Sequence, residues 1–382
     1  MNIVGIIIET NPFHNGHMYF INEIKEKYQP DLIIAVTSTS FTMRGEISII
    51  NKFDKTNALL KAGIDIVLEF PFILSTQSSD YFASNAISIL NTIGVNHIIC
   101  GCESDDINNI HNLYNLESSD NFKEIFKDNL KKYTSYKQTF ESTLTDLNID
   151  NNLISLFNKP NFTLAYQYYK SIKKINSTIK MSLIKRTNNY DDENLSQDIV
   201  SAKAIRQARL NNLDYRKYLP FDEQLIDLND AYQKLLDITN YVCLTKSNFS
   251  NTINDEGIIN YILKNYITTS SYINLITSLA NKRYSKSRIN RTILYMLLDV
   301  KEFYHNTKYL RLLGINTKGI SYLNTLSKNI KSLIFSSVKE LNINSLCYNI
   351  LEIELLATKL YSVITNNNDL LIKEYQLPIR KD

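Results

Sequence analysis

Tryptophan is absent from the 382 residues, and cysteine is scarce, with four examples at Cys100, Cys102, Cys243 and Cys347. Four cysteines are too few for a disulfide framework in a chain of this size, so we expect buried, reduced thiols. Long hydrophobic runs are also missing: nowhere do 18 apolar residues follow one another, and the apolar run at 3–8 has no cationic region before it. These absences predict a cytoplasmic protein without a membrane span or secretory signal.

The charge is distributed unevenly along an otherwise ordinary composition of 44% hydrophobic and 21% charged residues. The net charge is +3, but residues 282–331 hold eleven Lys or Arg against two acids, a local balance of +9. Such a segment is typical of a surface that binds a polyanion, although a solvated helix face is the commoner meaning of a basic run.

Short apolar runs alternate with helix-period stretches through the first hundred residues. The runs at 3–8, 32–36, 64–68 and 97–100 are rich in β-branched residues and predict buried parallel strands. Helices are expected between them at 18–27, 52–61 and 80–91, the last two ending at Gly63 and Gly94. This alternation predicts an α/β fold with a Rossmann-like, doubly wound parallel sheet.

The rest of the chain reads as mostly helical. Residues 105–180 predict a polar helical insertion, 180–186 predict one more strand, and the chain after Pro220 looks helical almost to its end. Because 382 residues exceed the usual size of one domain, we expect two: 1–219, carrying the sheet and the insertion, and a mainly helical domain at 220–382.

Two of the five histidines, His14 and His17, lie in the sequence NPFHNGH at 11–17, directly after the first predicted strand. Ligands of open α/β sheets bind beyond the carboxyl ends of the strands, and an i, i+3 pair opening a helix points both imidazoles toward an anion at the helix N-terminus. Gly16 would let a planar base or a ribose approach the backbone. The loop therefore suits a nucleoside triphosphate, with imidazoles donating to the α-phosphate as pyrophosphate leaves.

Two other interpretations of the histidine pair exist. The pair could bind zinc together with Cys100 and Cys102, although Cys-x-Cys is an atypical spacing for zinc, or both histidines could be polar loop residues. A second element supports the phosphate site: SAKAIRQARL (201–210) begins with a serine at a plausible helix N-cap and places Arg206 in the first two turns.

Together, HNGH (14–17) and SAKAIR (201–206) resemble the His-x-Gly-His and Ser/Thr-x-x-Ile-Arg elements of the nucleotidyltransferase superfamily. The chain resembles the tRNA(Met) cytidine acetate ligase family more closely, over nearly its whole length. The resemblance is carried by VGIIIETNPFHNGH (4–17), FTMRGEISIINKFDKTNALLKAGIDIVLEFPF (41–72), TQSSDYFASNAISILNTIGV (76–95), KPN (159–161), IKR (184–186) and SAKAIR, and more thinly by KRYSKSRINR (282–291) and YLRLLGINTKG (309–319).

This resemblance implies an enzyme that uses ATP, Mg²⁺ and acetate to make acetyl-adenylate. The enzyme would then acetylate N4 of the wobble cytidine of elongator tRNA(Met), without a stable protein partner. The implied catalytic residues are His14, His17 and Arg206. The implied ATP-binding residues are Ile7, Ile8, Glu9, Thr10, Asn11, Pro12, Phe13, His14, Asn15, Gly16, His17, Met18, Tyr19, Phe20, Gly101, Asn161, Arg186, Thr187 and Ser201.

For tRNA, the implied contacts are the basic residues Lys282, Arg283, Arg288, Arg291 and Arg311. Arg44, in MRGE, would add a cation near the acetyl or tRNA end of the site, or would instead pair with Glu46. The chain departs from its relatives at two places. PNFTLA (160–165) stands where they tend to have Pro-Asn-Asn-Ile-Leu-Gly, which bears on the acceptor-facing wall of the pocket through Phe162, and a glycine usual before Phe41 is replaced in TSTSF, at Thr39.

Two rival functions remain open at this point. One is a synthetase-like or small-molecule adenylyltransferase, because RYSKS (283–287) has a superficial likeness to the Lys-Met-Ser-Lys-Ser loop of synthetases. The other is a non-catalytic RNA-binding protein with a retired nucleotide site. A retired site would have lost His14, His17 and Arg206, and all three are intact.

Overall fold

The computed structural model describes residues 1–133, 135–175, 178–187, 198–246, 249, 252–305, 309–340 and 346–382. An eight-stranded mixed sheet runs through its centre, with strand order β5-β4-β1-β2-β3-β6-β7 and β8 paired to β6. The first five strands are parallel, and β6 joins β3 in antiparallel orientation. The strands are β1 (Ile3–Ile8), β2 (Leu32–Ser38), β3 (Ile66–Phe70), β4 (His97–Cys102), β5 (Lys180–Lys185), β6 (Leu310–Asn316), β7 (Ile334–Phe335) and β8 (Ile379–Lys381).

Both faces of the sheet are buried, which explains why the strands read as continuous apolar runs. In β2, Ile33 and Ala35 pack on one face with helices α1 (Asn15–Tyr28) and α2 (Lys52–Lys61). Leu32, Ile34 and Val36 pack on the other face with α3 (Phe72–Ser75), α4 (Ser79–Thr92) and α9 (Pro160–Ile175). The Rossmann-like α/β prediction is therefore confirmed, and the five sequence-predicted strands are present with boundaries that differ by at most two residues.

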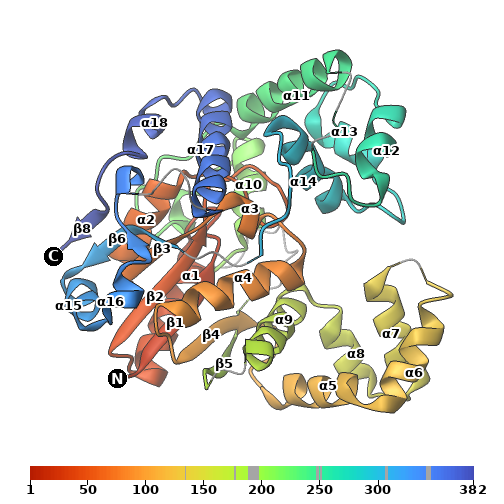
Figure 1. The fold of residues 1–382 in the computed structure, drawn as a ribbon, viewed down its shortest axis with the longest axis horizontal. Helices are drawn as coiled ribbons and strands as arrows, with labels where there is room; N and C mark the ends of the chain where they lie inside the picture. The colour runs from red at the N-terminus through yellow and green to blue at the C-terminus, as the bar shows by residue number, and fades with distance from the viewer. Residues whose placement is uncertain are drawn as a thin grey trace.

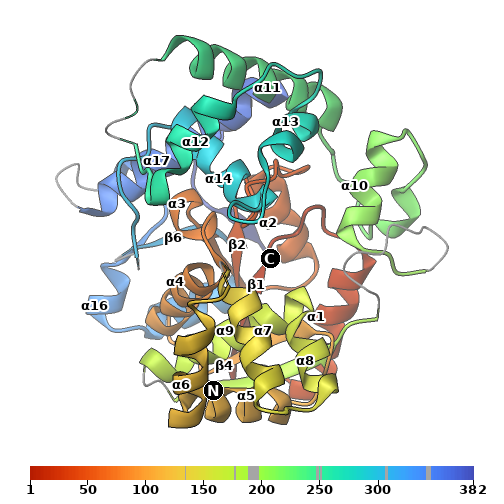
Figure 2. The same ribbon diagram turned by 90° about the vertical axis from the view of Figure 1, so that its right-hand side faces the viewer.

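Two groups of helices extend from one side of the sheet, at the right of Figure 1. The first group follows β4 and comprises α5 (Asn108–Ser118), α6 (Asp120–Asn129), α7 (Tyr136–Asp146) and α8 (Asn151–Phe157). The second comprises α11 (Leu228–Thr245), α12 (Ile258–Asn265), α13 (Tyr272–Leu279) and α14 (Lys286–Leu297), and Figure 2 shows it above the first group, with α10 (Ala202–Leu210) to one side. No helix within the described ranges is long and apolar enough to cross a membrane.

The C-terminal part of the chain returns to the sheet, so the expectation of a helical stretch from 220 almost to the end is wrong at β6, β7 and β8. Along the chain these strands alternate with α15 (Thr317–Thr325), α16 (Lys328–Lys331), α17 (Leu346–Thr365) and α18 (Asp369–Lys373), and a 3₁₀ turn at Val338–Glu340 follows β7. Two further 3₁₀ turns, at Arg216–Tyr218 and Asp255–Gly257, precede α11 and α12. β6 is held by pairing with β3, more than 200 residues earlier in the chain, and local periodicity carries no signal of such a partner.

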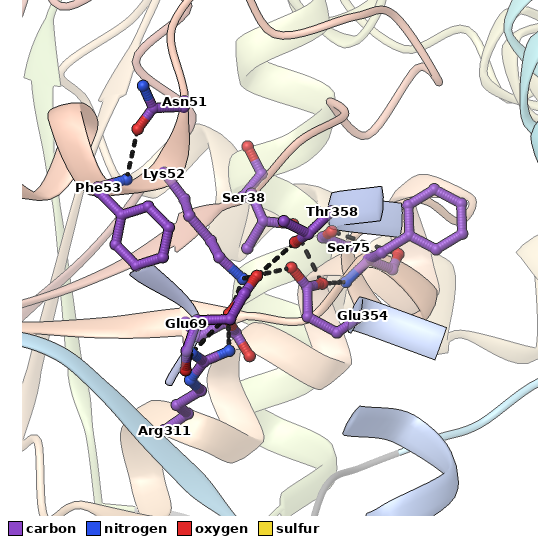
Figure 3. Close-up of polar contacts among 12 residues, drawn as sticks. Ser38, Asn51, Lys52, Phe53, Glu69, Ser75, Arg311, Glu354 and Thr358 are labelled. Atoms are coloured by element: carbon purple, nitrogen blue, oxygen red, sulfur yellow. Dashed lines mark hydrogen bonds and ion pairs between the residues drawn. The ribbon is translucent and has the colours of Figure 1, made fainter. Parts of the chain in front are cut away.

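A buried ion network joins this C-terminal part to the sheet (Figure 3). Lys52 Nζ lies 2.9 Å from the Glu69 carboxylate, 3.0 Å from that of Glu354 and 2.6 Å from that of Glu374. The Arg311 guanidinium lies 2.9 Å from Glu69 and 2.6 Å from Glu374, and every one of these side chains is at most 3% exposed. The network ties α2, β3, β6 and α17 to the residue that follows α18.

Three carboxylates share two cations in this network, and the pKa values of Glu354 and Glu374 move in opposite directions. Burial raises the pKa of Glu354 to about 7, because Lys52 is its single close cation and the other two glutamates repel its charge. Burial also disfavours the charged form of Glu374, but Lys52 and Arg311 together outweigh it and lower the pKa to about 2. Glu374 is therefore the structural anion, and Glu354 is the carboxyl that gains from holding a proton.

We expect opposite outcomes for the isosteric changes Glu374→Gln and Glu354→Gln. Losing the Glu374 charge leaves Lys52 and Arg311 under-compensated in the interior, so the free energy of unfolding should fall by about 3 kcal/mol or more. At pH 8, Glu354→Gln should leave the free energy of unfolding unchanged or raise it. The folded-state pKa of Glu354 is raised, so the stability that its protonated form contributes to the wild type is lost as pH rises from the unfolded pKa through about 7. Urea unfolding at pH 8 and pH 5 measures both, and a large loss from Glu354→Gln at pH 8 would contradict this assignment.

Candidate active site

A cavity of about 230 Å³ opens at the carboxyl edge of the sheet. Its floor is formed where β1, β4 and β5 end, at Ile8, Gly101 and Lys185. The N-terminal turns of α1 and α10 point into it, and the loop 42–46 closes one side. The cavity thus lies where the sequence placed the ligand site, beyond the carboxyl ends of the parallel strands.

Most of the residues expected to bind ATP line this cavity. Its wall includes Ile7, Ile8, Glu9, Thr10, Asn11, His14, Gly16, His17, Tyr19, Phe20, Gly101, Asn161, Arg186, Thr187, Ser201 and Arg206. Pro12, Phe13, Asn15 and Met18 are not part of the wall. The Phe13 ring is buried against Phe221, with centroids 5.7 Å apart, and the Asn15 amide donates to the Lys217 carbonyl. These two residues therefore hold the loop in place through contacts outside the cavity wall.

The two histidines form the N-terminal cap of α1. His14 is the N-cap residue, and its Nδ1 accepts a hydrogen bond from the Gly16 N–H at 3.0 Å. His17 Nδ1 accepts from the His14 N–H at 3.2 Å, and the ring centroids are 4.0 Å apart. Because both Nδ1 atoms act as acceptors, each neutral imidazole carries its proton on Nε2. The helix cap therefore places two side-chain Nε2–H donors at the N-terminus of α1, where the helix dipole favours an anion.

The surroundings keep both imidazoles uncharged. Burial lowers the pKa of His17 to about 3, with the Arg186 charge acting in the same direction. Burial lowers the pKa of His14 well below its usual value, helped by His17, Arg186 and Arg206. Positive charge gathered on one wall of a cavity disfavours a further proton and favours an anion, so the same charges that neutralise the histidines make the cavity suitable for phosphate.

Glycine is present at two positions of the site, Gly16 and Gly101, for different physical reasons. A Cβ on Gly16 would lie 2.7 Å from His14 Cε1, so glycine at this position admits the capping imidazole. Gly16 also lines the cavity, and the close approach of a base or ribose to it stays a prediction. A Cβ on Gly101 would meet its nearest protein atom, Arg186 Cγ, at an ordinary 3.7 Å. The missing side chain at Gly101 thus leaves space in the cavity itself, as expected for close approach of a ligand to the backbone.

Unsatisfied polar atoms mark the start of the loop. Thr10 Oγ1 and Asn11 Nδ2 are buried and have no hydrogen-bond partner among the described residues. Thr10 also has a φ of 41°, in the left-handed region that costs a β-branched residue energy. Buried polar groups are normally paired, so these two atoms indicate a polar ligand at this wall.

Helix α10 brings the third predicted catalytic residue to the cavity. Ser201 is its N-cap, as expected, and the Ser201 hydroxyl accepts from the Ala204 N–H at 3.0 Å. Arg206 donates to the Asn11 carbonyl at 2.8 Å and lies 3.2 Å from the Glu46 carboxylate. Glu46 therefore pairs with Arg206, and the pairing of Arg44 with Glu46 that MRGE suggested stays a prediction. Arg206 fastens the histidine loop to the loop 42–46 while its guanidinium lines the cavity.

Comparison with known proteins assigns the family. The sequence pattern of the family described as HIGH Nucleotidyl Transferase matches residues 1–374. A tRNA(Met) cytidine acetate ligase from Caldicellulosiruptor saccharolyticus is 35% identical over 345 residues, covering 84% of each chain, and one from a Thermoanaerobacter species is 31% identical over the whole of both chains. The chain belongs to the HIGH nucleotidyltransferase family.

Solved structures of Thermotoga maritima TmcAL have the same fold. The apo form superposes with a TM-score of 0.87 at 25% identity, covering 100% of this chain and 99% of the other. A second form, bound with alpha-thio ATP, superposes with a TM-score of 0.83 at 24% identity. The arrangement of sheet and helices in this chain is therefore that of the Thermotoga maritima TmcAL structures.

The departure at Phe162 lies outside the wall of the site. The Phe162 side chain is buried in the core, while Asn161 faces the cavity. Glu103 holds this helix start, accepting from the Asn161 side-chain amide at 2.8 Å and from the Phe162 N–H at 2.7 Å. The expectation that Phe162 alters the acceptor-facing wall is therefore wrong, because residue 162 points into the core. At the second departure, the Thr39 hydroxyl donates to Glu354 at 3.1 Å.

An apolar section of the wall was missed from the sequence. It is formed by Met43, Phe82, Cys100, Leu164 and Tyr168, which come from the loop 42–46 and from α4, β4 and α9. Apolar residues at helix and strand period read as core, so no local signal distinguishes them. Lys203 was also missed, although its place two residues after the N-cap Ser201 was a usable signal.

The structure can be compared with the zinc alternative and with the tRNA contacts that the sequence suggested. No three His, Cys, Asp or Glu side chains gather to hold a metal ion in the described parts of the chain. Of the basic residues, Lys282 and Arg283 are exposed, and Arg288 pairs with Asp255 and Glu256 at 3.0 Å each. Arg311 is only 3% exposed and belongs to the ion network, so its assignment to tRNA binding is wrong.

We expect neither His14 nor His17 to take up a proton between about pH 5 and pH 8 in the free enzyme, because burial and nearby arginines lower both pKa values. Nitrogen chemical shifts of ¹⁵N-labelled histidine should report the Nε2–H tautomer for both rings throughout this range. A midpoint near the ordinary histidine pKa, in a resonance assigned by the His14→Ala or His17→Ala variant, would contradict the neutral pair.

Proposed function

We propose that this protein is an ATP-dependent ligase that activates acetate as acetyl-adenylate and acetylates N4 of the wobble cytidine of elongator tRNA(Met). One observation carries the proposal: two neutral imidazoles, both with Nε2–H groups, cap a helix that opens into a cavity lined by Arg186 and Arg206. Relatives named tRNA(Met) cytidine acetate ligase over 84–100% of the chain support this reaction among those of the family.

In the first step, an acetate oxygen forms a bond to the α-phosphorus of ATP, and pyrophosphate leaves. Negative charge grows on the non-bridging oxygens, where His14 and His17 donate hydrogen bonds without changing protonation state. Arg186, Lys203 and the N-terminus of α10 supply fixed positive potential for the phosphates. The apolar section of Met43, Phe82, Cys100, Leu164 and Tyr168 suits the methyl group of acetate. Catalysis then consists mainly of positioning and charge neutralisation.

Magnesium enters this scheme as part of the substrate. The carboxylates on the cavity wall are Glu9, which accepts from the Met43 N–H at 2.7 Å, and Glu46, which pairs with Arg206. Two engaged carboxylates do not make a protein cage for Mg²⁺, whereas Mg²⁺ commonly travels on the phosphates of ATP with most of its water. We assign the ion to the β- and γ-phosphates and assign no protein ligand to it.

In the second step, the N4 amine of the cytidine attacks the acyl carbon, and AMP leaves with the oxygen that came from acetate. The wobble base must be unstacked to reach a cavity enclosed by the 42–46 loop. Lys282 and Arg283, both exposed in the segment before α14, would hold the RNA backbone in this proposal.

We expect His14→Ala and His17→Ala each to lower acetate-dependent ATP–pyrophosphate exchange at least ~100-fold, the scale for losing one donor to developing charge. The matched control is His111→Ala, since His111 lies on α5 against Tyr169 and outside the cavity. Circular dichroism verifies folding of each variant. Exchange at the wild-type rate in a folded His17→Ala protein would remove the histidines from the mechanism.

The adenylate route has its own test with acetate labelled by ¹⁸O in the carboxyl group. One labelled oxygen should appear in AMP, because the oxygen that attacks phosphorus stays with the nucleotide when the amine attacks carbon. Mass spectrometry of the AMP and of the tRNA nucleosides checks the label and the N4-acetylcytidine together. Unlabelled AMP, or ADP and phosphate as products, would overturn the mechanism even if the tRNA is acetylated.

A further inference from the structure

A second cavity, of about 290 Å³, lies between the start of α4 and the helical group of α11–α14. Tyr81 of α4, Phe303 and Tyr295 give it aromatic walls, and Arg288 and Arg291 of α14 give it two guanidinium groups. Its volume is at the lower end of the range for small-ligand pockets, roughly 300 Å³. None of its lining residues belongs to the candidate active site.

The two cavities are neighbours. Tyr81 lines the second cavity and the next residue, Phe82, lines the first. On the other side, the Arg291 guanidinium donates to the carbonyl of Met43 at 3.4 Å, and Met43 lines the first cavity. Gly45, with a φ of 76°, packs so closely on α14 that a Cβ there would lie 2.9 Å from the Arg291 backbone nitrogen. One turn of α4 and the loop 42–46 are therefore the partition between the cavities.

Two aromatic rings at the rim of the second cavity are partly exposed to solvent. Tyr81 is 44% exposed and stacks on His305, with centroids 4.3 Å apart and planes at 20°. Phe303 is 39% exposed and meets Tyr295 edge to face at 5.8 Å. Exposed rings beside basic side chains are the usual platform for nucleobases in single-stranded RNA sites.

The charges of the cavity favour a base over a bare phosphate. Arg288 is held by Asp255 and Glu256, whose carboxylates also face the cavity. Arg291 is different: it is half-buried, burial lowers its pKa, and no carboxylate of the described residues pairs with it. Carboxylates accept from the exocyclic amines of bases, and a guanidinium without a counter-ion can stack on a base or contact its phosphate.

We propose that the second cavity binds the nucleobase next to the reacting cytidine in the RNA strand, stacked on Tyr81. This inference rests on the proposed function and extends it, because it assigns a second RNA subsite beside the first. Taking up a neighbouring base would splay the anticodon loop across the partition and so present the cytidine to the active site. The subsite acts on RNA binding and leaves the adenylation of acetate untouched.

The variants Tyr81→Ala and Tyr81→Phe test the stacking. We expect Tyr81→Ala to raise the KM for tRNA about ten-fold, within the range for one lost stacking contact, while Tyr81→Phe keeps the wild-type KM. Acetate-dependent ATP–pyrophosphate exchange, which needs no RNA, should be the same in both variants and in the wild type. The control is Tyr241→Ala, because Tyr241 is a 69% exposed tyrosine on α11 outside both cavities.

Changing the RNA completes the test. An abasic nucleotide on the 5′ or the 3′ side of the cytidine should raise KM for the wild type by a similar factor on one side only. Tyr81→Ala should then add no further loss with that RNA, since both changes remove the same contact. Additive losses with both abasic RNAs, or an unchanged KM for Tyr81→Ala, would overturn the subsite.

Two further outcomes are decisive. If a mononucleotide such as CMP activates acetylation by the wild type, and Tyr81→Ala abolishes that activation, the cavity is a free-nucleotide site and the RNA assignment is wrong. If the wild type shows neither ATP–pyrophosphate exchange nor acetylation, the proposed function itself fails. Failure of the subsite alone looks different, because the wild type then keeps both activities and only the KM of Tyr81→Ala stays unchanged.

Discussion

The buried ion network around Lys52 is the constraint on which the active site depends. Lys52 opens α2, and three residues later Lys55 donates to the carbonyls of Ser38 and Thr39, where β2 ends. Glu354 accepts from the Thr39 hydroxyl and, at 2.6 Å, from the Phe72 N–H, where β3 has ended. The network and the neighbouring Lys55 therefore fix the ends of the two central strands β2 and β3.

From those strand ends, a chain of contacts reaches the cavity. The loop that leaves β2 carries Met43, whose N–H is held by Glu9, and Glu46, which pairs with Arg206. Arg206 in turn holds the carbonyl of Asn11 in the histidine loop. A C-terminal carboxylate at Glu354 is thus connected, through the loop 42–46, to the helix cap made by His14 and His17. Each of these contacts is a hydrogen bond or ion pair made by a side chain, which positions a loop more tightly than apolar contact does.

Features of the structure that depend on local interactions could be predicted from the sequence, and features that depend on distant partners could not. The strands β1 to β5, the N-cap at Ser201 and the position of His14 and His17 each have a signal within a few residues, and each was predicted. β6 was missed because its partner β3 is far away in the chain, and Arg311 was misassigned because a basic residue in a basic segment gives no sign of three buried glutamates. Phe162 was misplaced for a similar reason: the direction of a side chain at a helix start depends on Glu103, 59 residues earlier.

The antiparallel pairing of β6 with β3 has a consequence for synthesis of the chain. Strand β3 is complete once residue 70 has been made, but its outer edge stays unpaired until residues 310–316 emerge from the ribosome. Throughout that interval the nascent protein presents a buried-type strand, IVLEF, with free backbone groups and with Glu69 lacking Arg311. Open apolar edges invite pairing with other chains. The order of the strands along the chain thus leaves the outer edge of β3 open until the segment from residue 310 onward is made, and that segment closes it.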